Sequence, residues 1–266
     1  MSSLRLKYMA IVSMQYPFST RWSGWLAGLL VICLTLFGCS TPMQADSQIS
    51  PQLKEQVLQI IRENPEAILD SVQAYQRKQQ AAQQKEQQAF LEQTKTNPKA
   101  VIGSSPTTGA KSGKVLLVEF SDFQCPYCSK AHAILKPFMA KHSDVVTLVY
   151  KHFPLTSIHA EAMPAAKAAW AAGQQGQFWA YHDALFTQQE QLGESFYQAT
   201  AKTLKLDLKR FDRDRANAET AIQQDIELGK KLGLSGTPFF IMNGETLTGL
   251  SSVDELEEVL GRVSKG

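Results

Sequence analysis

The chain has few cysteines and almost no net charge, and both shortages narrow the possible functions. Only four of its 266 residues are cysteine, and one Cys-x-x-Cys pair occurs, Cys125 and Cys128. A structural zinc site normally needs two further cysteine or histidine ligands at short spacing, so we expect no metal at this pair. The formal net charge is +2, from 27 basic and 25 acidic residues. So balanced a charge argues against nucleic acid as a partner.

Acidic residues are absent from the start of the chain, where the first one is Asp46. Three basic residues, Arg5, Lys7 and Arg21, come before the apolar run Trp25–Phe37. This run is too short to span a membrane comfortably. Basic residues before a short apolar run are typical of a secretory signal peptide, so we expect an exported protein. Disulfides form and persist outside the cytoplasm, which fits a redox function.

The end of the apolar run carries a possible lipidation site. Leu36–Cys39 resembles the lipobox of bacterial lipoproteins, with Cys39 as the lipid acceptor, although Phe37 departs from that pattern. We therefore expect residues 1–38 to be a signal peptide of the lipoprotein type. An uncleaved anchor and ordinary signal cleavage are the alternatives, and Met14 is a second possible start.

Residues 39–49 are expected to be a tether, and residues 50–96 carry a helical pattern that begins at Ser50–Pro51. Apolar residues at helical spacing form what we call the apolar stripe: Leu53, Val57, Ile60, Ile61, Ile68, Leu69, Val72 and Tyr75. This segment is expected to be either an oligomerisation stalk or a helical spacer. Residues 97–113 are rich in glycine and predict a flexible linker, although Val101–Ile102 could add an edge strand.

The Cys-x-x-Cys pair stands between a predicted buried strand, Val115–Phe120, and a predicted helix. Pro126 suits the first helical position, which puts Cys125 at the helix N-terminus. Unpaired backbone N–H groups there favour negative charge, so the pKa of the first thiol should fall and make it a nucleophile. An inert bridge is the alternative, but closing so short a loop removes little chain entropy.

The segments VLLVEFSDFQCPYC and, far downstream, SGTPFFIMNG resemble the DsbA-like branch of the thioredoxin superfamily. This resemblance implies an α/β, thioredoxin-like fold over residues 114–266, with a helical insertion at about residues 155–234. Asn243–Gly244 predicts a type I′ hairpin turn between two late strands. The segment Ile61–Gln79 is similar to the N-terminal helical segment of ScsC-like and Com1-like members, some of which use it to trimerise.

The same resemblance implies the roles of the site residues. Cys125 would exchange disulfides with substrate, Cys128 would resolve the mixed disulfide, and Glu119 would accept the Cys128 proton. Substrate binding would fall to Pro126, Tyr127, Thr237 and Pro238. If the Thr237–Pro238 bond is cis, the Thr237 backbone could pair with an extended substrate. No cofactor is expected beyond the redox-active Cys125–Cys128 disulfide.

The implied function is a thiol–disulfide oxidoreductase on the periplasmic side of the cell envelope, lipid-anchored to a membrane. Its partners would be exported cysteine-containing proteins, a membrane redox protein and a further copy of itself. The residues do not distinguish an oxidase from an isomerase or a reductase. An oligomeric stalk would favour the isomerase. The alternative is a copper-binding or chaperone-like protein with the same cysteine pair. His132 lies near the cysteine pair but has no partner at the spacing of a zinc site. The other histidines, His142, His152, His159 and His182, are scattered, and we expect them at surface or satisfied core positions.

Overall fold

The computed structural model describes residues 50–111 and 114–265, and the chain divides into two units after Asn64. The predicted signal peptide, the tether and Cys39 lie outside the described residues. Among those described, no helix combines the length and apolar character that crossing a membrane requires.

The first unit is described from Ser50 onward and holds helix α1, Pro51–Glu63. Ser50 caps it, because its side-chain oxygen accepts a hydrogen bond from the Leu53 N–H at 3.1 Å. The helix therefore begins where the sequence predicts. Its apolar residues are exposed, namely Leu53, Val57, Ile60 and Ile61.

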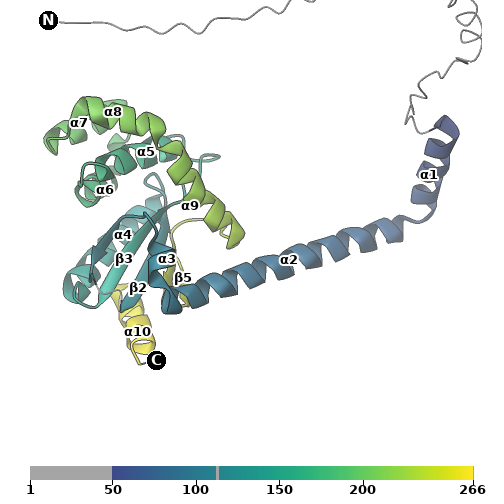
Figure 1. Cartoon of the computed structure of the whole chain (residues 1–266), viewed down its shortest axis with the longest axis horizontal. Helices are drawn as coiled ribbons and strands as arrows, with labels where there is room; N and C mark the ends of the chain where they lie inside the picture. Colours follow the sequence, from purple (N-terminus) through teal and green to yellow (C-terminus); the bar gives the residue numbers. More distant parts are fainter. Residues whose placement is uncertain (1–49, 112–113, 266) are drawn as a thin grey trace, which may run out of the picture. The chain divides into compact units, whose positions relative to one another are not determined.

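The second unit is built on a five-stranded sheet with the order β1-β3-β2-β4-β5 (Figure 1). The strands are β1 Thr107–Gly109, β2 Val115–Ser121, β3 Val146–His152, β4 Phe239–Met242 and β5 Glu245–Thr248. Strands β2 and β3 are parallel, and the other pairs are antiparallel. Every residue of β2 is buried, as its apolar sequence predicts for a central strand.

The two faces of β2 pack against different helices, because side chains alternate along a strand. Leu116, Val118 and Phe120 share an apolar cluster with Ile222 and Ile226 of α9, Glu219–Lys231. Leu117 faces the other way and shares a cluster with residues of α4, Pro126–His142, and α10, Val253–Val263. Glu119 and Ser121 have the same parity as Leu117, so two polar side chains lie on the α4 face.

Four further helices and a short 3-10 turn connect β3 to α9 and β4, where the helical insertion was predicted. They are α5 Ala162–Gly173, α6 Phe178–Thr187, the turn Gln189–Gln191, α7 Glu194–Thr203 and α8 Leu208–Asn217. The predicted hairpin turn is also present. Asn243 and Gly244 both have positive φ, 42° and 87°, as a type I′ turn requires.

The boundary between stalk and catalytic domain differs from our prediction. Residues 97–113 are not simply a linker, because they contain helix α3, Pro98–Ile102, and the edge strand β1, Thr107–Gly109. The edge strand suggested at Val101–Ile102 was therefore misplaced, since these residues are helical. The end of helix α2, Pro65–Thr96, belongs to the core: Phe90 is 7% exposed, and its ring centre lies 6.5 Å from that of Phe120. Earlier on α2, the stripe residues Ile68, Leu69, Val72 and Tyr75 are exposed. Phe90 and Thr94 are the buried residues of this helix, and the Gln- and Lys-rich sequence around them conceals that signal.

Candidate active site

The two cysteines lie in the first turn of α4, immediately after the central strand. Cys125 is the N-cap of the helix and Pro126 holds its first position, as the sequence predicts. Cys125 is 3% exposed and Cys128 is 0% exposed. Cys125 is therefore the more accessible of the two sulfurs, although both cysteines are buried.

Asp122 and Gln189 hold the loop before the cysteines in place. The Asp122 carboxylate accepts hydrogen bonds from the Gln124 N–H at 2.8 Å, the Leu155 N–H at 3.0 Å and the His159 ring at 2.7 Å. The Gln189 amide donates to the Cys125 carbonyl oxygen at 2.9 Å. These contacts fix the direction of α4, and none of them was predicted from the sequence.

The two thiols have strongly different acidities. The pKa of Cys125 falls to about 5, because the Cys128 thiol can donate a hydrogen bond to its sulfur, and this effect outweighs burial. The Thr237 hydroxyl and the N–H groups of Cys128 and Tyr127 lower it further. Burial first, and the neighbouring Cys125 sulfur second, raise the pKa of Cys128 well above its usual range. At pH 7 the outer sulfur is thus a thiolate and the inner one a thiol.

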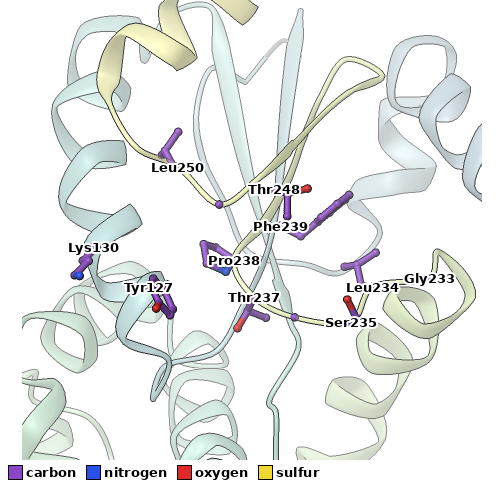
Figure 2. A pocket seen from close by; sticks show the side chains of 12 residues that line it. Tyr127, Lys130, Gly233, Leu234, Ser235, Thr237, Pro238, Phe239, Thr248 and Leu250 are labelled. Carbon is purple, nitrogen blue, oxygen red and sulfur yellow. The ribbon is translucent and has the colours of Figure 1, made fainter.

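A proline loop faces the pair from across the sheet. The Thr237–Pro238 peptide bond is cis, and the Cys125 sulfur lies 3.4 Å from the Thr237 carbonyl oxygen, to which its thiol form can donate a hydrogen bond. Figure 2 shows a pocket between this loop and the first turn of α4, which carries Tyr127 and Lys130. The pocket has a volume of about 400 Å³ and is also lined by Phe239 and Leu250.

Three of the four residues predicted to contact substrate line this pocket. They are Tyr127, Thr237 and Pro238, whereas Pro126 is not among its lining residues. Tyr127 is 66% exposed, so it presents an aromatic face to solvent beside the cysteines. Apolar walls next to a reactive sulfur suit an extended peptide with an apolar side chain near its cysteine.

Glu119 lies inside the protein on the α4 face of β2. It is 1% exposed, and burial raises its pKa to about 7, although Ser121 and His132 oppose the rise. Its Oε1 atom has no hydrogen-bond partner, and the same holds for the buried hydroxyls of Ser121 and Tyr150. A carboxyl group with this pKa can gain and lose a proton near neutrality.

The structure also brings together a group that sequence reasoning missed. His132 lies one turn after Cys128 on α4, and its Nε2 atom is 3.0 Å from Asp183 Oδ1 on α6. The same oxygen is 3.2 Å from His182 Nδ1. His132 and His182 are buried, as a core position requires, but they form one cluster instead of scattering. The available signal was the spacing of four residues between Cys128 and His132, which puts both on one face of the helix.

Comparisons with known proteins agree with this architecture. A family model described as Thioredoxin matches residues 101–262. A thioredoxin-like oxidoreductase from Silicibacter pomeroyi superimposes with a TM-score of 0.59 and 30% identity, over 64% of this chain and 99% of that one. Proteus mirabilis ScsC in a transitional conformation gives a TM-score of 0.57 and 25% identity, over 80% of this chain and 96% of that one.

Curated relatives match part of the chain by sequence. The Na(+)/H(+) antiporter NhaA 3 of Salinispora tropica is 37% identical over 150 residues, which cover 56% of this chain and 23% of the antiporter. The chain therefore matches about a quarter of the length of that relative. Since the family model covers more than half of the chain, this protein belongs to the thioredoxin family, as a DsbA-like member of the superfamily.

Proposed function

We propose that this protein exchanges disulfides with cysteines of exported proteins through Cys125 and Cys128. The observation that supports this most is the pair of unequal sulfurs at the start of α4, opposite a cis-proline loop. A sulfur that is a thiolate at pH 7 is both a good nucleophile and a good leaving group. The sulfur lies beside the pocket that Tyr127 and Leu250 line, and this pocket gives the substrate chain a surface to bind.

In the oxidising direction, the reaction begins on the Cys125–Cys128 disulfide. A substrate thiolate attacks the Cys125 sulfur, the Cys125–Cys128 bond breaks, and Cys128 leaves as a thiolate that takes up a proton. A second substrate thiolate then attacks the first substrate sulfur and releases Cys125 as a thiolate. The substrate loses two electrons and gains a disulfide, while the protein becomes a dithiol.

In the isomerising direction, the Cys125 thiolate attacks a wrong substrate disulfide and is released when another substrate thiol displaces it, with no net electron transfer. When the Cys125–Cys128 disulfide opens or forms, Cys128 must change its protonation state inside the protein, whereas in the isomerising direction it stays a thiol. Glu119 is the group proposed to exchange that proton, because it shares the α4 face of β2 and has a pKa of about 7.

The direction and setting of the reaction are further parts of the proposal. Isomerisation is favoured if the exposed apolar stripe brings several copies together, because several cysteine pairs around one cavity suit reshuffling of disulfides. The structural relative Proteus mirabilis ScsC also covers part of this N-terminal segment. We place the protein on the periplasmic side of the envelope, held by a lipid on Cys39 and recycled by a membrane redox partner.

A trapping experiment tests the proposed function. In the Cys128→Ala variant, substrates should remain attached to Cys125 as mixed disulfides, because the resolving sulfur is gone. In the Cys125→Ala variant, trapping should be absent, because Cys128 is fully buried. Envelope extracts run on non-reducing gels show the adducts. Equal trapping by the two variants would contradict the assigned roles, and trapping by neither would contradict the function.

A further inference from the structure

We propose that His132, His182 and Asp183 form a binding site for a divalent metal ion of the zinc class. One ligand atom from each side chain lies within 4.8 Å of the other two. In the described part of the chain, this is the one group of three or more His, Cys, Asp or Glu side chains with such an arrangement. Two imidazoles and one carboxylate are the protein ligands of many zinc sites that keep a fourth position open. This site is separate from the cysteine pair and goes beyond the disulfide chemistry proposed above.

Two of the three distances between the ligand atoms suit a tetrahedral ion, and the third is within 4.8 Å. Zinc binds nitrogen and oxygen ligands at about 2.0–2.1 Å, so neighbouring ligands of a tetrahedron lie about 3.3–3.4 Å apart. His132 Nε2 and His182 Nδ1 lie 3.0 Å and 3.2 Å from Asp183 Oδ1. Each of these edges needs to lengthen by only a few tenths of an ångström to admit an ion.

The two histidines are held in place by the fold. His182 packs edge-on against Phe186, with ring centres 4.9 Å apart, and His132 stacks on the same phenylalanine at 5.3 Å. Two imidazoles that packing already holds in place lose little conformational entropy when they bind an ion.

The cluster also opens into a cavity of about 170 Å³, lined by all three residues together with Glu119 and Trp179. This volume leaves room for a fourth ligand such as a water molecule. Two buried polar atoms of the lining residues have no hydrogen-bond partner, Glu119 Oε1 and His182 Nε2. When the metal occupies Nδ1 of His182, the ring proton resides on Nε2, so the ring stays neutral.

The competing explanation is a plain hydrogen-bond cluster, in which both imidazoles donate to Asp183. Lys136 favours it, because its Nζ atom is 3.0 Å from Asp183 Oδ2 and a cation there disfavours a second one. The Lys136 side chain is 62% exposed, however, so it can move into solvent when an ion arrives. A single ion pair would need only one imidazole at the carboxylate, whereas here two imidazoles converge on the same oxygen.

The chain contains a matched control on the same helix. His142 Nε2 lies 2.9 Å from Glu257 Oε1, and Lys141 pairs with the same oxygen at 2.8 Å. This pair reproduces the histidine, carboxylate and lysine of the cluster but lacks the second imidazole. Binding of zinc to the cluster should therefore survive the loss of His142 and fail with the loss of His132.

The experiment titrates zinc chloride into the full chain by isothermal calorimetry. The protein is first oxidised, so that Cys125 and Cys128 form a disulfide and cannot bind the metal as thiolates. One zinc ion per chain is expected. His132→Ala and Asp183→Asn should each weaken the affinity at least about tenfold, whereas His142→Ala should leave it unchanged. Cobalt(II) should give the visible absorption of a tetrahedral site in the wild type and in His142→Ala only.

The design separates this proposal from its rivals. Circular dichroism without metal shows that each variant is folded, and Asp183→Asn keeps the shape of the side chain if His132→Ala does not fold. Absence of zinc binding by the oxidised wild type at micromolar concentration would overturn the site. Binding that persists in both cluster variants would also overturn it, because the ion would then lie elsewhere. Failure of cysteine trapping would leave this result unaffected.

Discussion

The low pKa of Cys125 predicts how the redox potential of the protein changes with pH. A thiol with its ordinary pKa of 9.0 is neutral at pH 7, whereas Cys125 with a pKa of about 5 is a thiolate. Reduction of the Cys125–Cys128 disulfide above pH 5 therefore takes up two electrons and one proton, which goes to Cys128. Below pH 5 it takes up two protons, one on each sulfur.

The expected magnitude follows from the difference in pKa. Because the pKa is lower in the folded protein, the stabilisation of the reduced form is fully present above about pH 9 and is lost as the pH falls through about 5. At pH 7 it amounts to two pKa units, or about 3 kcal/mol. For a two-electron couple this raises the redox potential by about 60 mV relative to an unperturbed dithiol. The potential should also fall by about 30 mV per pH unit between pH 5 and 9, and by about 59 mV per unit below pH 5.

The assay is equilibration of the protein with a redox couple of known potential at a series of pH values, with the oxidised fraction read after acid quenching. The Glu119→Gln variant is measured alongside, because Glu119 also titrates near pH 7 and could add its own proton. Thiolate absorbance of the reduced protein gives the Cys125 pKa independently. A slope near 59 mV per unit that continues to pH 8 in both proteins would refute a thiolate at Cys125.

Four further predictions concern the interior, the stalk and the anchor. Glu119→Gln should slow the resolution of mixed disulfides at least about tenfold in stopped-flow assays, and unchanged rates would exclude Glu119 as the proton acceptor. The same variant should be more stable than the wild type, by about 3 kcal/mol at pH 7 and by less at pH 5, in urea unfolding, because the buried carboxylate with its raised pKa is costly only when ionised. The chain from Ser40 should be oligomeric in light scattering, and the chain from Arg77 should be a monomer. A chain that starts at Lys99 should in addition lose about 3–5 kcal/mol of stability, because it lacks Phe90. A monomeric chain from Ser40 would refute the oligomer hypothesis. Cys39→Ser should release the protein from membranes without loss of redox activity, and a variant that still pellets would show a different anchor.

Most of the site and most of the fold could be predicted from short patterns in the sequence. Cys125 at a helix start, the hairpin at Asn243–Gly244 and the buried strand with Glu119 each follow from neighbouring residues, and the structure has them where they were predicted. Contacts between distant residues could not be found in this way. The His159–Asp122 and His132–Asp183 pairs join residues 37 and 51 positions apart, and nothing local shows which distant carboxylate such a histidine meets.

The exposure of Cys125 and the docking of Phe90 illustrate the same limit. A helix N-terminus predicts acidity, but how far the loops around Thr237 and Gln189 cover the sulfur depends on the whole insertion. Phe90 lies in a polar helical sequence that looks like a solvated spacer from end to end. Its burial depends on an open patch beside Phe120, which only the assembled sheet provides.

Because the end of α2 is docked on the domain, the length of this helix sets both how far its earlier apolar residues lie from the domain and which way they face. Gln83 donates a hydrogen bond to the Lys230 carbonyl oxygen at 3.4 Å, so the helix is fixed to the domain from there to Phe90. Each added residue in a helix advances it by about 1.5 Å and turns it by about 100°. Two residues inserted between Tyr75 and Gln83 would thus rotate Ile68, Leu69 and Val72 by about 200° around the axis, with a shift of only about 3 Å. Seven residues would shift them by about 10 Å and restore their facing to within about 20°. Natural insertions and deletions in this stretch should therefore come in lengths that preserve the helical phase.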